Sequence, residues 1–178
     1  MRLFRHTTAA ALAVVGALGL VAVPAAANEP TEPDLVAWFE GRQIRLADGW
    51  GEARACMSDL QTTHCYRTEA EMDAAHPDEG RAERGAVLLA TCSPALKLYR
   101  GTSYTGNVLE LSTRFVTISL APYGFDNDTS SYKIGGCNSR LYDTTTGGSA
   151  YPGNTNAGVW APSMLSGWDN RVGSVYIN

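Results

Sequence analysis

The stretches Tyr99–Gly106 (YRGTSYTG) and Phe125–Tyr132 (FDNDTSSY) decide the fold of the second half of this 178-residue chain. In the first stretch, two tyrosines precede Gly106, and a glycine supplies a positive φ that other residues resist. The second stretch is rich in hydroxyl, carboxylate and amide side chains, which bond to nearby backbone groups in tight turns. We predict that Ser131 closes the motif by a hydrogen bond to the hairpin backbone near Gly106.

Short segments of β character surround these two stretches. From Ala86 onward the chain contains VLLATC, LKLYRG, VLELS, FVTISL, SSYKIG, RLYD and SVYIN, separated by turns rich in glycine, asparagine and aspartate. Strands of this length at this spacing predict a β-sandwich or a β-barrel. We therefore expect residues 86–178 to form one mainly β domain.

The two stretches together resemble one Greek-key motif of the βγ-crystallin superfamily. That motif combines two aromatic residues and a glycine in a hairpin with a later run of Asn or Asp residues that ends in Ser or Thr and then Ser. The matching residues are Tyr99, Tyr104, Gly106, Asp126, Asn127, Ser130 and Ser131.

The resemblance continues as a degraded second copy. The copy consists of Tyr142, then YPG at Tyr151–Gly153, then WDNRVGSVY at residues 168–176, with Ser174 as the closing serine. The spacing between its two tyrosines is longer than in the first copy because TTTGGSA is inserted, and Gly173 stands where the motif has Ser or Thr. The resemblance covers about residues 95–178 and implies a two-sheet Greek-key sandwich of βγ-crystallin type.

Domains of this type often bind up to two calcium ions through their Asn/Asp-rich loops, so the resemblance implies the same here. Ca²⁺ prefers oxygen ligands from carboxylates, amides, hydroxyls and backbone carbonyls. The candidate ligands are Asp126, Asn127 and Ser130 in the first loop, with Asp128 as an additional charge, and Asp169 and Asn170 in the second loop. Because Gly173 has no hydroxyl, the second site should be weak or empty. The alternative is that these polar residues only stabilise turns.

The first 27 residues have the pattern of a secretory signal peptide. Two arginines precede an apolar run over residues 9–23, which ends at the small residues Ala25–Ala27. This run is too short for a comfortable membrane span. We expect cleavage after Ala27, secretion, no membrane span in the mature protein, and a flexible lead-in over residues 28–34.

All four cysteines follow the predicted cleavage point, and an even number in an exported chain indicates two disulfides. Four cysteines allow three pairings, and the sequence alone does not choose among them. We favour Cys56–Cys65, which closes a short loop, and Cys92–Cys137, which ties the start of the second half to its middle. Zinc is the competing use because His64 precedes Cys65, but the close spacing of structural zinc sites is absent.

Residues 35–85 predict a small β-rich region with one short helix and a linker. Two or three strands should be joined by tight turns, and their buried residues should be Trp38, Phe39, Ile44, Leu46 and Trp50. Thr68 and Glu71 form a capping box, which should start the helix at Thr68. Pro77, Gly80 and dense charge should end the helix and form the linker.

Charge and motif content exclude several classes of function. Without the first 27 residues, 12 of the 14 basic residues remain against 18 acidic ones, a net charge of −6 that disfavours nucleic acid as a partner. The sequences HExxH and GxSxG are absent. We interpret His64 and His76 as surface residues, and Glu69, Glu71 and Asp73 as a solvated helix face. The sequence thus predicts a non-catalytic, monomeric protein.

Peptidase inhibition is the alternative function. The chain also resembles secreted bacterial inhibitors of metalloproteases that are built on a crystallin-like domain. The loop Met57–His64, enclosed if Cys56 pairs with Cys65, could enter the cleft of an extracellular protease as a preorganised loop. The loop Thr144–Val159 is a second exposed candidate, and both loops could equally be ordinary surface connections. A structural or cell-surface module without metal is the remaining possibility.

Overall fold

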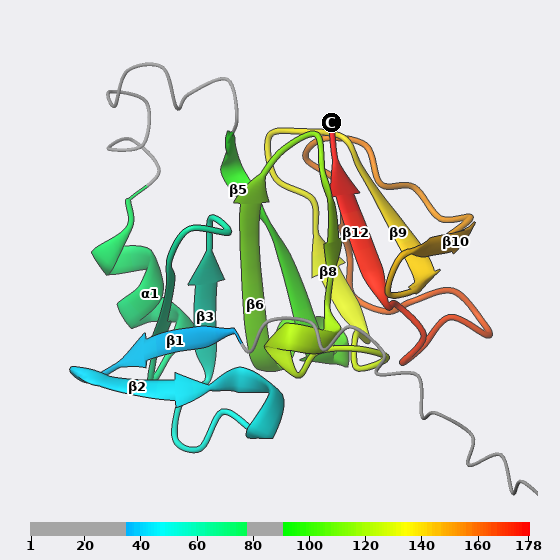
Figure 1. Cartoon of the computed structure of the whole chain (residues 1–178). Coiled ribbons are helices and arrows are strands. Elements are labelled where there is room, and N and C mark those ends of the chain that lie inside the picture. The colour runs from blue at the N-terminus through cyan, green and yellow to red at the C-terminus, as the bar shows by residue number, and fades with distance from the viewer. Residues whose placement is uncertain (1–34, 78–90) are drawn as a thin grey trace, which may run out of the picture. The chain divides into compact units, whose positions relative to one another are not determined.

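The computed structural model describes residues 35–77 and 91–178. The predicted signal peptide (1–27), the lead-in (28–34) and the boundary between residues 85 and 86 lie outside these ranges. Within the described ranges, no helix is long and apolar enough to cross a membrane. The fold is mainly β, as predicted, with two sheets and one α-helix (Figure 1).

Residues 91–178 form two consecutive Greek-key repeats. The strands of the first repeat are β5 (Thr91–Gly101), β6 (Thr105–Thr113), β7 (Thr117–Ser119) and β8 (Ser131–Lys133), with 3-10 helices at η4 (Thr102–Tyr104) and η5 (Ala121–Tyr123). The strands of the second repeat are β9 (Ser139–Thr144), β10 (Gly147–Ala150), β11 (Trp160–Ala161) and β12 (Ser174–Ile177).

The two repeats exchange their third strands. β7 of the first repeat pairs with β12 of the second, with Ile118 opposite Val175. β11 of the second repeat pairs with β8 of the first, with Ala161 opposite Tyr132. Each sheet therefore contains strands from both repeats, and the repeats cannot separate without breaking both sheets.

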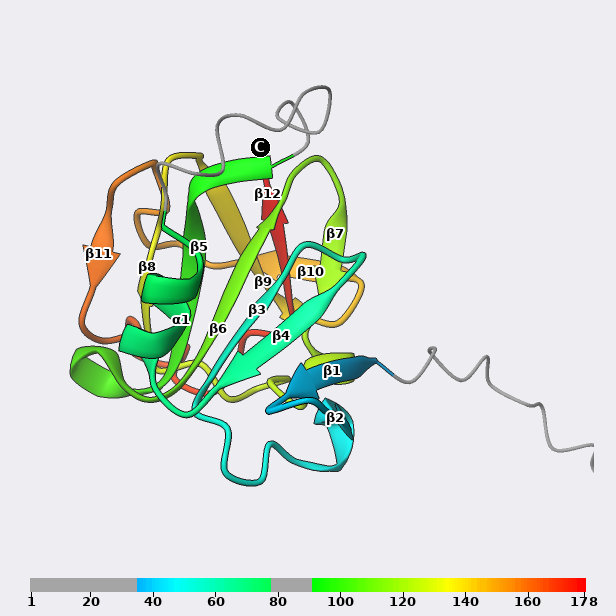
Figure 2. The same cartoon turned by 90° about the vertical axis from the view of Figure 1, so that its left-hand side faces the viewer.

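The N-terminal region extends the sheet of the first repeat. Its elements are β1 (Val36–Phe39), β2 (Arg42–Arg45), η1 (Leu46–Asp48), β3 (Ala55–Ser58), β4 (Thr63–Tyr66) and α1 (Glu69–Ala75). β3 runs parallel to β6, with Ala55 opposite Val108. The result is an eight-stranded sheet in the order β11-β8-β5-β6-β3-β4-β1-β2, beside a four-stranded sheet in the order β10-β9-β12-β7 (Figures 1 and 2).

Side chains also tie the N-terminal region to the first repeat. The indole Nε1 of Trp50 donates a hydrogen bond to the Tyr123 carbonyl at 2.7 Å, and the hydroxyls of Ser58 and Tyr123 lie 3.0 Å apart. Gly124 has φ +60°, and a Cβ there would lie 2.4 Å from the Leu46 carbonyl oxygen. A glycine is thus required where the two regions meet.

The two predicted disulfides are confirmed. Cys56 pairs with Cys65, and Cys92 pairs with Cys137. The described residues contain no free cysteine. The first bond joins residues that face each other across β3 and β4, and the second joins the start of β5 to the segment between β8 and β9.

The main core lies between the two sheets, and it contains Phe39, Leu46 and Trp50 as predicted. Ile44 is partly buried against this core. The prediction for Trp38 was wrong, because its side chain is 44% exposed. Along β1 the burial alternates, so Ala37 and Phe39 face inward while Val36 and Trp38 face outward.

Helix α1 covers the opposite face of the eight-stranded sheet (Figure 2). Met72 is its buried residue and packs with Ala55, Tyr99 and Val108. The Thr68 half of the predicted capping box is confirmed, because the Thr68 hydroxyl accepts a hydrogen bond from the Glu71 amide at 3.1 Å. The Glu71 carboxylate accepts from the Arg67 amide, one residue before the cap.

Candidate functional site

A single serine closes the hairpin between β5 and β6. The hydroxyl of Ser131 donates to the Gly101 carbonyl at 2.6 Å and accepts from the Tyr104 amide at 3.1 Å. The predicted closure is therefore confirmed, with Gly101 and Tyr104 as its partners. Gly106 has φ +77°, which explains the preference for glycine at the start of β6. The rings of Tyr99 and Tyr104 contact edge to face at 5.7 Å.

The second repeat is closed in the same way. The hydroxyl of Ser174 donates to the Thr144 carbonyl at 2.6 Å and accepts from the Gly147 amide at 3.1 Å. Ser174, Thr144 and Gly147 occupy the positions that Ser131, Gly101 and Tyr104 hold in the first repeat. Each residue lies 43 positions after its equivalent. The hairpins have equal spacing, so the segment TTTGGSA (residues 144–150) is part of the regular repeat and contains all of β10.

Tyr151 and Gly153 do not form the second hairpin corner, and this prediction was wrong. The ring of Tyr151 packs edge to face against Tyr132 and Trp168 at 5.8 and 5.3 Å, and its hydroxyl accepts from the Leu165 amide. The corner position that Tyr104 holds in the first repeat is held by Gly147 in the second. With no aromatic residue at the corner, the sequence pattern pointed to the next Tyr and Gly along the chain.

The two polar loops lie against each other in a nearly symmetric arrangement. The Asn127 amide donates to the Val172 carbonyl at 2.9 Å, and the Asn170 amide donates to the Thr129 carbonyl at 3.1 Å. Asn127 and Asn170 both have φ +54°. Asparagine tolerates this left-handed conformation better than most residues, so the same residue type recurs at both positions.

One side-chain contact joins the predicted ligands across the loops. The hydroxyl of Ser130 donates to the amide oxygen of Asn170 at 3.3 Å. The sequence had grouped Ser130 with Asn127 of its own loop, whereas the structure places it beside Asn170 of the other loop. Asn127, by the same symmetry, faces the position of Gly173, and its amide nitrogen donates instead to Asp126 at 3.0 Å.

Comparisons with known proteins gave matches among solved structures only; no family model and no curated protein matches this chain. A βγ-crystallin from Ciona intestinalis is 21% identical, with a TM-score of 0.40, over 47% of this chain and 98% of that one. A βγ-crystallin domain from Clostridium beijerinckii is 17% identical, with a TM-score of 0.39, over 47% and 95%. One from Flavobacterium johnsoniae is 20% identical, with a TM-score of 0.37, over 47% and 93%.

The two sheets and the serine-closed corners agree with the two-sheet Greek-key arrangement that the sequence resemblance implied, and the exchange of β7 and β11 between the repeats is an additional finding of the structure. The C-terminal half of the chain has the βγ-crystallin fold. The matched structures correspond to less than half of this chain. The N-terminal strands join the sheet of the first repeat through the pairing of β3 with β6.

Two oxygen atoms in the first loop of the βγ-crystallin domain are buried without a hydrogen-bond partner among the described residues. They are Oδ1 of Asp126 and Oγ1 of Thr129. Burial raises the pKa of Asp126, although the hydrogen bond from Asn127 opposes this shift. A buried acceptor without a donor is costly unless a ligand or water supplies the missing contact. Thr129 was missed in the sequence because the motif leaves its position unspecified.

The other two candidate aspartates are placed differently. The carboxylate of Asp128 forms an ion pair with Nε of Arg100 at 2.8 Å. The Arg100 guanidinium also donates to the Gly124 carbonyl and lies over the rings of Trp50 and Phe125. Asp128 thus anchors the loop to the protein. Asp169 is exposed, and no described residue forms a hydrogen bond or ion pair with it.

The presence of glycine at position 173 has a steric explanation in the βγ-crystallin fold. A Cβ at this position would lie 2.6 Å from the carbonyl carbon of Thr144 and 2.9 Å from the amide nitrogen of Thr145. These are backbone atoms, which cannot rotate away. The second loop therefore lacks the hydroxyl that Ser130 supplies in the first.

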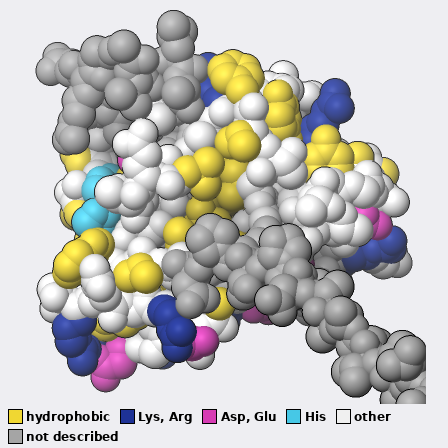
Figure 3. All heavy atoms as spheres, in the orientation of Figure 1, with side chains coloured by type: hydrophobic (Ala, Val, Ile, Leu, Met, Phe, Trp, Pro, Cys, Tyr) yellow, Lys and Arg dark blue, Asp and Glu magenta, His cyan; other side chains and the backbone are white. Residues whose placement is uncertain are grey.

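The described residues contain no cluster of three or more His, Cys, Asp or Glu side chains arranged to hold a metal. A cation between the two loops would depend on one carboxylate, on hydroxyl and amide oxygens, and on backbone carbonyls. His64 and His76 lie together at the surface, with ring centroids 6.3 Å apart (Figure 3), and the Tyr66 hydroxyl lies 2.6 Å from Nε2 of His76.

Proposed function

We propose that this protein is an extracellular βγ-crystallin-type module that binds Ca²⁺ between its two polar loops. The observation that carries the proposal is the buried, unpartnered Oδ1 of Asp126 in the first loop, and the contact of Ser130 with Asn170 joins that loop to the second. Two disulfides support the extracellular location, because such bonds persist in oxidising compartments.

The donor set suits a hard cation. Ca²⁺ takes six to eight oxygen ligands at about 2.3–2.6 Å. Asp126 would contribute the charged oxygen, Ser130 and Asn170 neutral oxygens from opposite loops, and water or backbone carbonyls the remainder. Because the second loop has Gly173 in place of a hydroxyl residue, we expect one calcium ion per chain.

A bound ion would join the two repeats at the place where their loops already touch. A ligand that binds only the folded state raises the free energy of unfolding by RT ln(1 + [L]/Kd). With a Kd in the range of about 10⁻⁴–10⁻³ M found in extracellular calcium modules, 10 mM Ca²⁺ should add about 1.4–2.7 kcal/mol.

The test is thermal unfolding of the secreted, purified protein in EGTA and in increasing CaCl₂, with isothermal titration calorimetry for stoichiometry. We expect a rise in Tm with calcium, a stoichiometry of one, and loss of the rise in the variant Asp126→Asn. Asp48→Asn is the matched control, since it removes one negative charge at an exposed position outside both loops. An unchanged Tm at 10 mM Ca²⁺ would reject calcium binding.

Peptidase inhibition is a second candidate, favoured by the loop between β3 and β4. Oδ1 of Asp59 accepts hydrogen bonds from the amides of Gln61 and Thr62 at 2.9 and 2.7 Å. The Ser58 hydroxyl accepts from the Leu60 amide and the Thr63 hydroxyl. These bonds hold Leu60 at φ +67° with 43% of its side chain exposed. The loop is thus preorganised around one exposed apolar side chain, which lowers the entropy cost of binding.

Incubation with a thermolysin-like metalloprotease tests this candidate. Inhibition should weaken at least about tenfold in Leu60→Ala, which corresponds to about 1.4 kcal/mol. Phe115→Ala is the control, because Phe115 is also an exposed apolar residue on a loop between strands but lies outside the disulfide-closed hairpin. Cleavage of the protein without any slowing of substrate turnover would reject inhibition. The other loop, Thr144–Val159, is pinned to the fold by hydrogen bonds such as Tyr132 Oη to the Asn154 carbonyl.

A further inference from the structure

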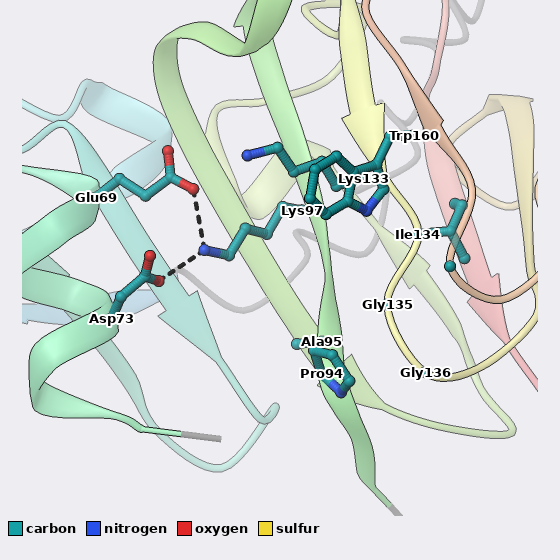
Figure 4. Close-up of a pocket in the computed structure, with 11 residues that line it drawn as sticks. Glu69, Asp73, Pro94, Ala95, Lys97, Lys133, Ile134, Gly135, Gly136 and Trp160 are labelled. Atoms are coloured by element: carbon teal, nitrogen blue, oxygen red, sulfur yellow. Dashed lines mark hydrogen bonds and ion pairs between the residues drawn. The ribbon is translucent and has the colours of Figure 1, made fainter. Parts of the chain in front are cut away.

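A groove of about 510 Å³ lies on the outer face of the eight-stranded sheet, between helix α1 and the strands β8 and β11. Figure 4 shows its acidic wall, Glu69 and Asp73 from α1, opposite Trp160. Lys97 and Lys133 lie along the sheet between these walls, and Ile134 is among the apolar lining residues. The volume falls in the range typical of small-molecule sites.

The acidic wall is held by one ion network around the partly buried Lys97. Nζ of Lys97 lies 3.0 Å from Oε1 of Glu69, 2.6 Å from Oδ1 of Asp73 and 3.7 Å from Glu110. The Tyr99 hydroxyl also donates to Oε1 of Glu69 at 2.7 Å. The second carboxylate oxygens, Oε2 of Glu69 and Oδ2 of Asp73, accept no hydrogen bond from a described residue. Two acceptors in fixed positions are therefore available to a ligand.

Lys133 supplies the matching donor. Its Nζ lies 5.2 Å from the ring centre of Tyr99, 4.9 Å from that of Tyr104 and 5.1 Å from that of Trp160. Cation–π contacts hold the ammonium group in place but leave its N–H groups without an oxygen acceptor. No described residue accepts a hydrogen bond from it, so Lys133 can donate to a bound molecule.

Trp160 offers an apolar surface at the edge of the same groove. Its side chain is 62% exposed, whereas Trp50 and Trp168 are buried. The indole is nevertheless held, because Lys133 lies over it and Tyr104 contacts its ring edge to face at 6.3 Å. An exposed but fixed indole is suited to stacking against a flat apolar surface with little loss of side-chain entropy.

We propose that this groove binds a neutral saccharide, with a sugar ring stacked on Trp160 and its hydroxyls bonded to Glu69, Asp73 and Lys133. Sugar hydroxyls both donate and accept hydrogen bonds, and the C–H face of a pyranose is apolar. The groove contains both kinds of hydrogen-bonding group beside one aromatic surface. Its lining contains two acidic and two basic side chains, so the charges balance, which favours an uncharged ligand over an ionic one.

The carboxylates of the groove act as hydrogen-bond acceptors. Burial acts to raise the pKa of Glu69, but hydrogen bonds from Tyr99 and Lys97 outweigh it and hold the pKa below its usual value. Glu69 therefore remains ionised at neutral pH and does not resemble the proton donor of a glycosidase, whose pKa is raised. The groove is thus proposed as a binding site. It shares no lining residue with the two polar loops, so it can be tested independently of calcium.

The experiment uses the full secreted protein, retention on chitin, cellulose and xylan, and calorimetric titration with the soluble hexasaccharides of the same three sugars. We expect binding of at least one hexasaccharide, weakened tenfold or more by Trp160→Ala. Trp38→Ala is the matched control, because Trp38 is also exposed but lies on β1, outside the groove, and this variant should bind as the parent does. Trp160→Phe, which keeps a ring, should recover part of the affinity.

Three results would overturn the proposal. The first is the absence of binding to all three polysaccharides and their hexasaccharides by a protein with the parental Tm. The second is binding that Trp160→Ala and Trp38→Ala weaken equally. The third is binding that disappears at 0.5 M NaCl, because screening at that salt concentration removes ionic attraction while hydrogen bonds to a neutral sugar persist.

Discussion

The two repeats of the βγ-crystallin domain form the same serine-closed corner, but they differ in where glycine stands. The first repeat has the glycine in the hairpin, and the second has it in the polar loop. In the first repeat the hairpin has Gly101 and the loop has Ser130. In the second repeat the hairpin has Thr144 and the loop has Gly173, and a Cβ at Gly173 would lie 2.6 Å from the Thr144 backbone. The missing hydroxyl in the second loop is therefore a consequence of close packing.

This difference teaches that a departure from a sequence motif can have a local steric cause. The backbone hydrogen bonds between the loops remain nearly symmetric, at 2.9 Å for Asn127 and 3.1 Å for Asn170. The side-chain contacts are asymmetric, since Ser130 bonds to Asn170 whereas Asn127 bonds to Asp126. The two repeats share a scaffold and differ in the side-chain oxygen atoms that their loops present.

The largest effect should come from Gly173→Ser, which inserts the side chain that the motif would predict. We expect a loss of about 3 kcal/mol in the free energy of unfolding, because overpacking against backbone is costly, and no second calcium ion. Chemical denaturation and calorimetric stoichiometry measure both quantities. The double variant Thr144→Gly with Gly173→Ser, which copies the residue pair of the first repeat, should recover little of the loss, because glycine keeps the backbone atoms that the new Cβ would meet. Full stability in the single variant would contradict the steric explanation.

The two serines that close the corners, Ser131 and Ser174, should contribute equally to the free energy of unfolding. Ser131→Ala and Ser174→Ala each leave one carbonyl and one amide without a partner, so each should cost about 1–3 kcal/mol. Denaturant unfolding of the two variants side by side checks the expectation. A difference above about 1 kcal/mol would show that the corners are unequal despite their matching hydrogen bonds.

The two asparagines should differ in their effect on calcium. Asn170→Gly removes an oxygen that lies beside Ser130 and should weaken binding about tenfold, or about 1.4 kcal/mol. Asn127→Gly should weaken it less than about threefold, because this side chain faces Gly173. Glycine accepts the positive φ at both positions, so both variants should fold. Equal loss in both variants would argue for two equivalent sites.

The smallest effect concerns pH in the absence of calcium. Burial raises the pKa of Asp126, so the folded state binds this proton at a higher pH than the unfolded state does. The resulting penalty is present above the raised pKa and is lost as pH falls toward the unfolded value. Asp126→Asn should thus be slightly more stable than the parent at pH 7 in EGTA, with a difference that shrinks toward pH 4. A difference that grows on acidification would reverse the sign of this argument, and Asp169→Asn controls for charge.

The sequence predicted the first repeat well because its signals are local. Ser131 and Gly106 each lie in a short stretch whose chemistry specifies a turn, and the cap at Thr68 depends on a residue three positions away. The second hairpin was misplaced because Gly147 lacks the aromatic side chain that marks the corner. Its true position follows only from the 43-residue spacing between Ser131 and Ser174.

Contacts between distant parts of the chain could not be predicted. No residue pattern indicates that β3 pairs in parallel with β6, because Ala55 and Val108 satisfy any neighbouring strand equally well. The contact of Ser130 with Asn170 likewise depends on how the repeats exchange strands. The adjacent residues Trp38 and Phe39 were both predicted to be buried, although successive side chains of a strand point to opposite faces, and which face of β1 is buried depends on the neighbouring strands.

The parallel pairing of β3 with β6 has a consequence for production and storage of the protein. A chain trimmed to its crystallin half would leave the backbone N–H and C=O groups along one side of β6 without partners. Such a bare strand edge is a template for pairing with a second molecule and for fibrous aggregation. In the whole chain, the edge of this sheet is instead the short strand β2 (Arg42–Arg45), whose two arginines discourage further strand addition. The N-terminal strands thus cover the edge of β6 that such trimming would expose.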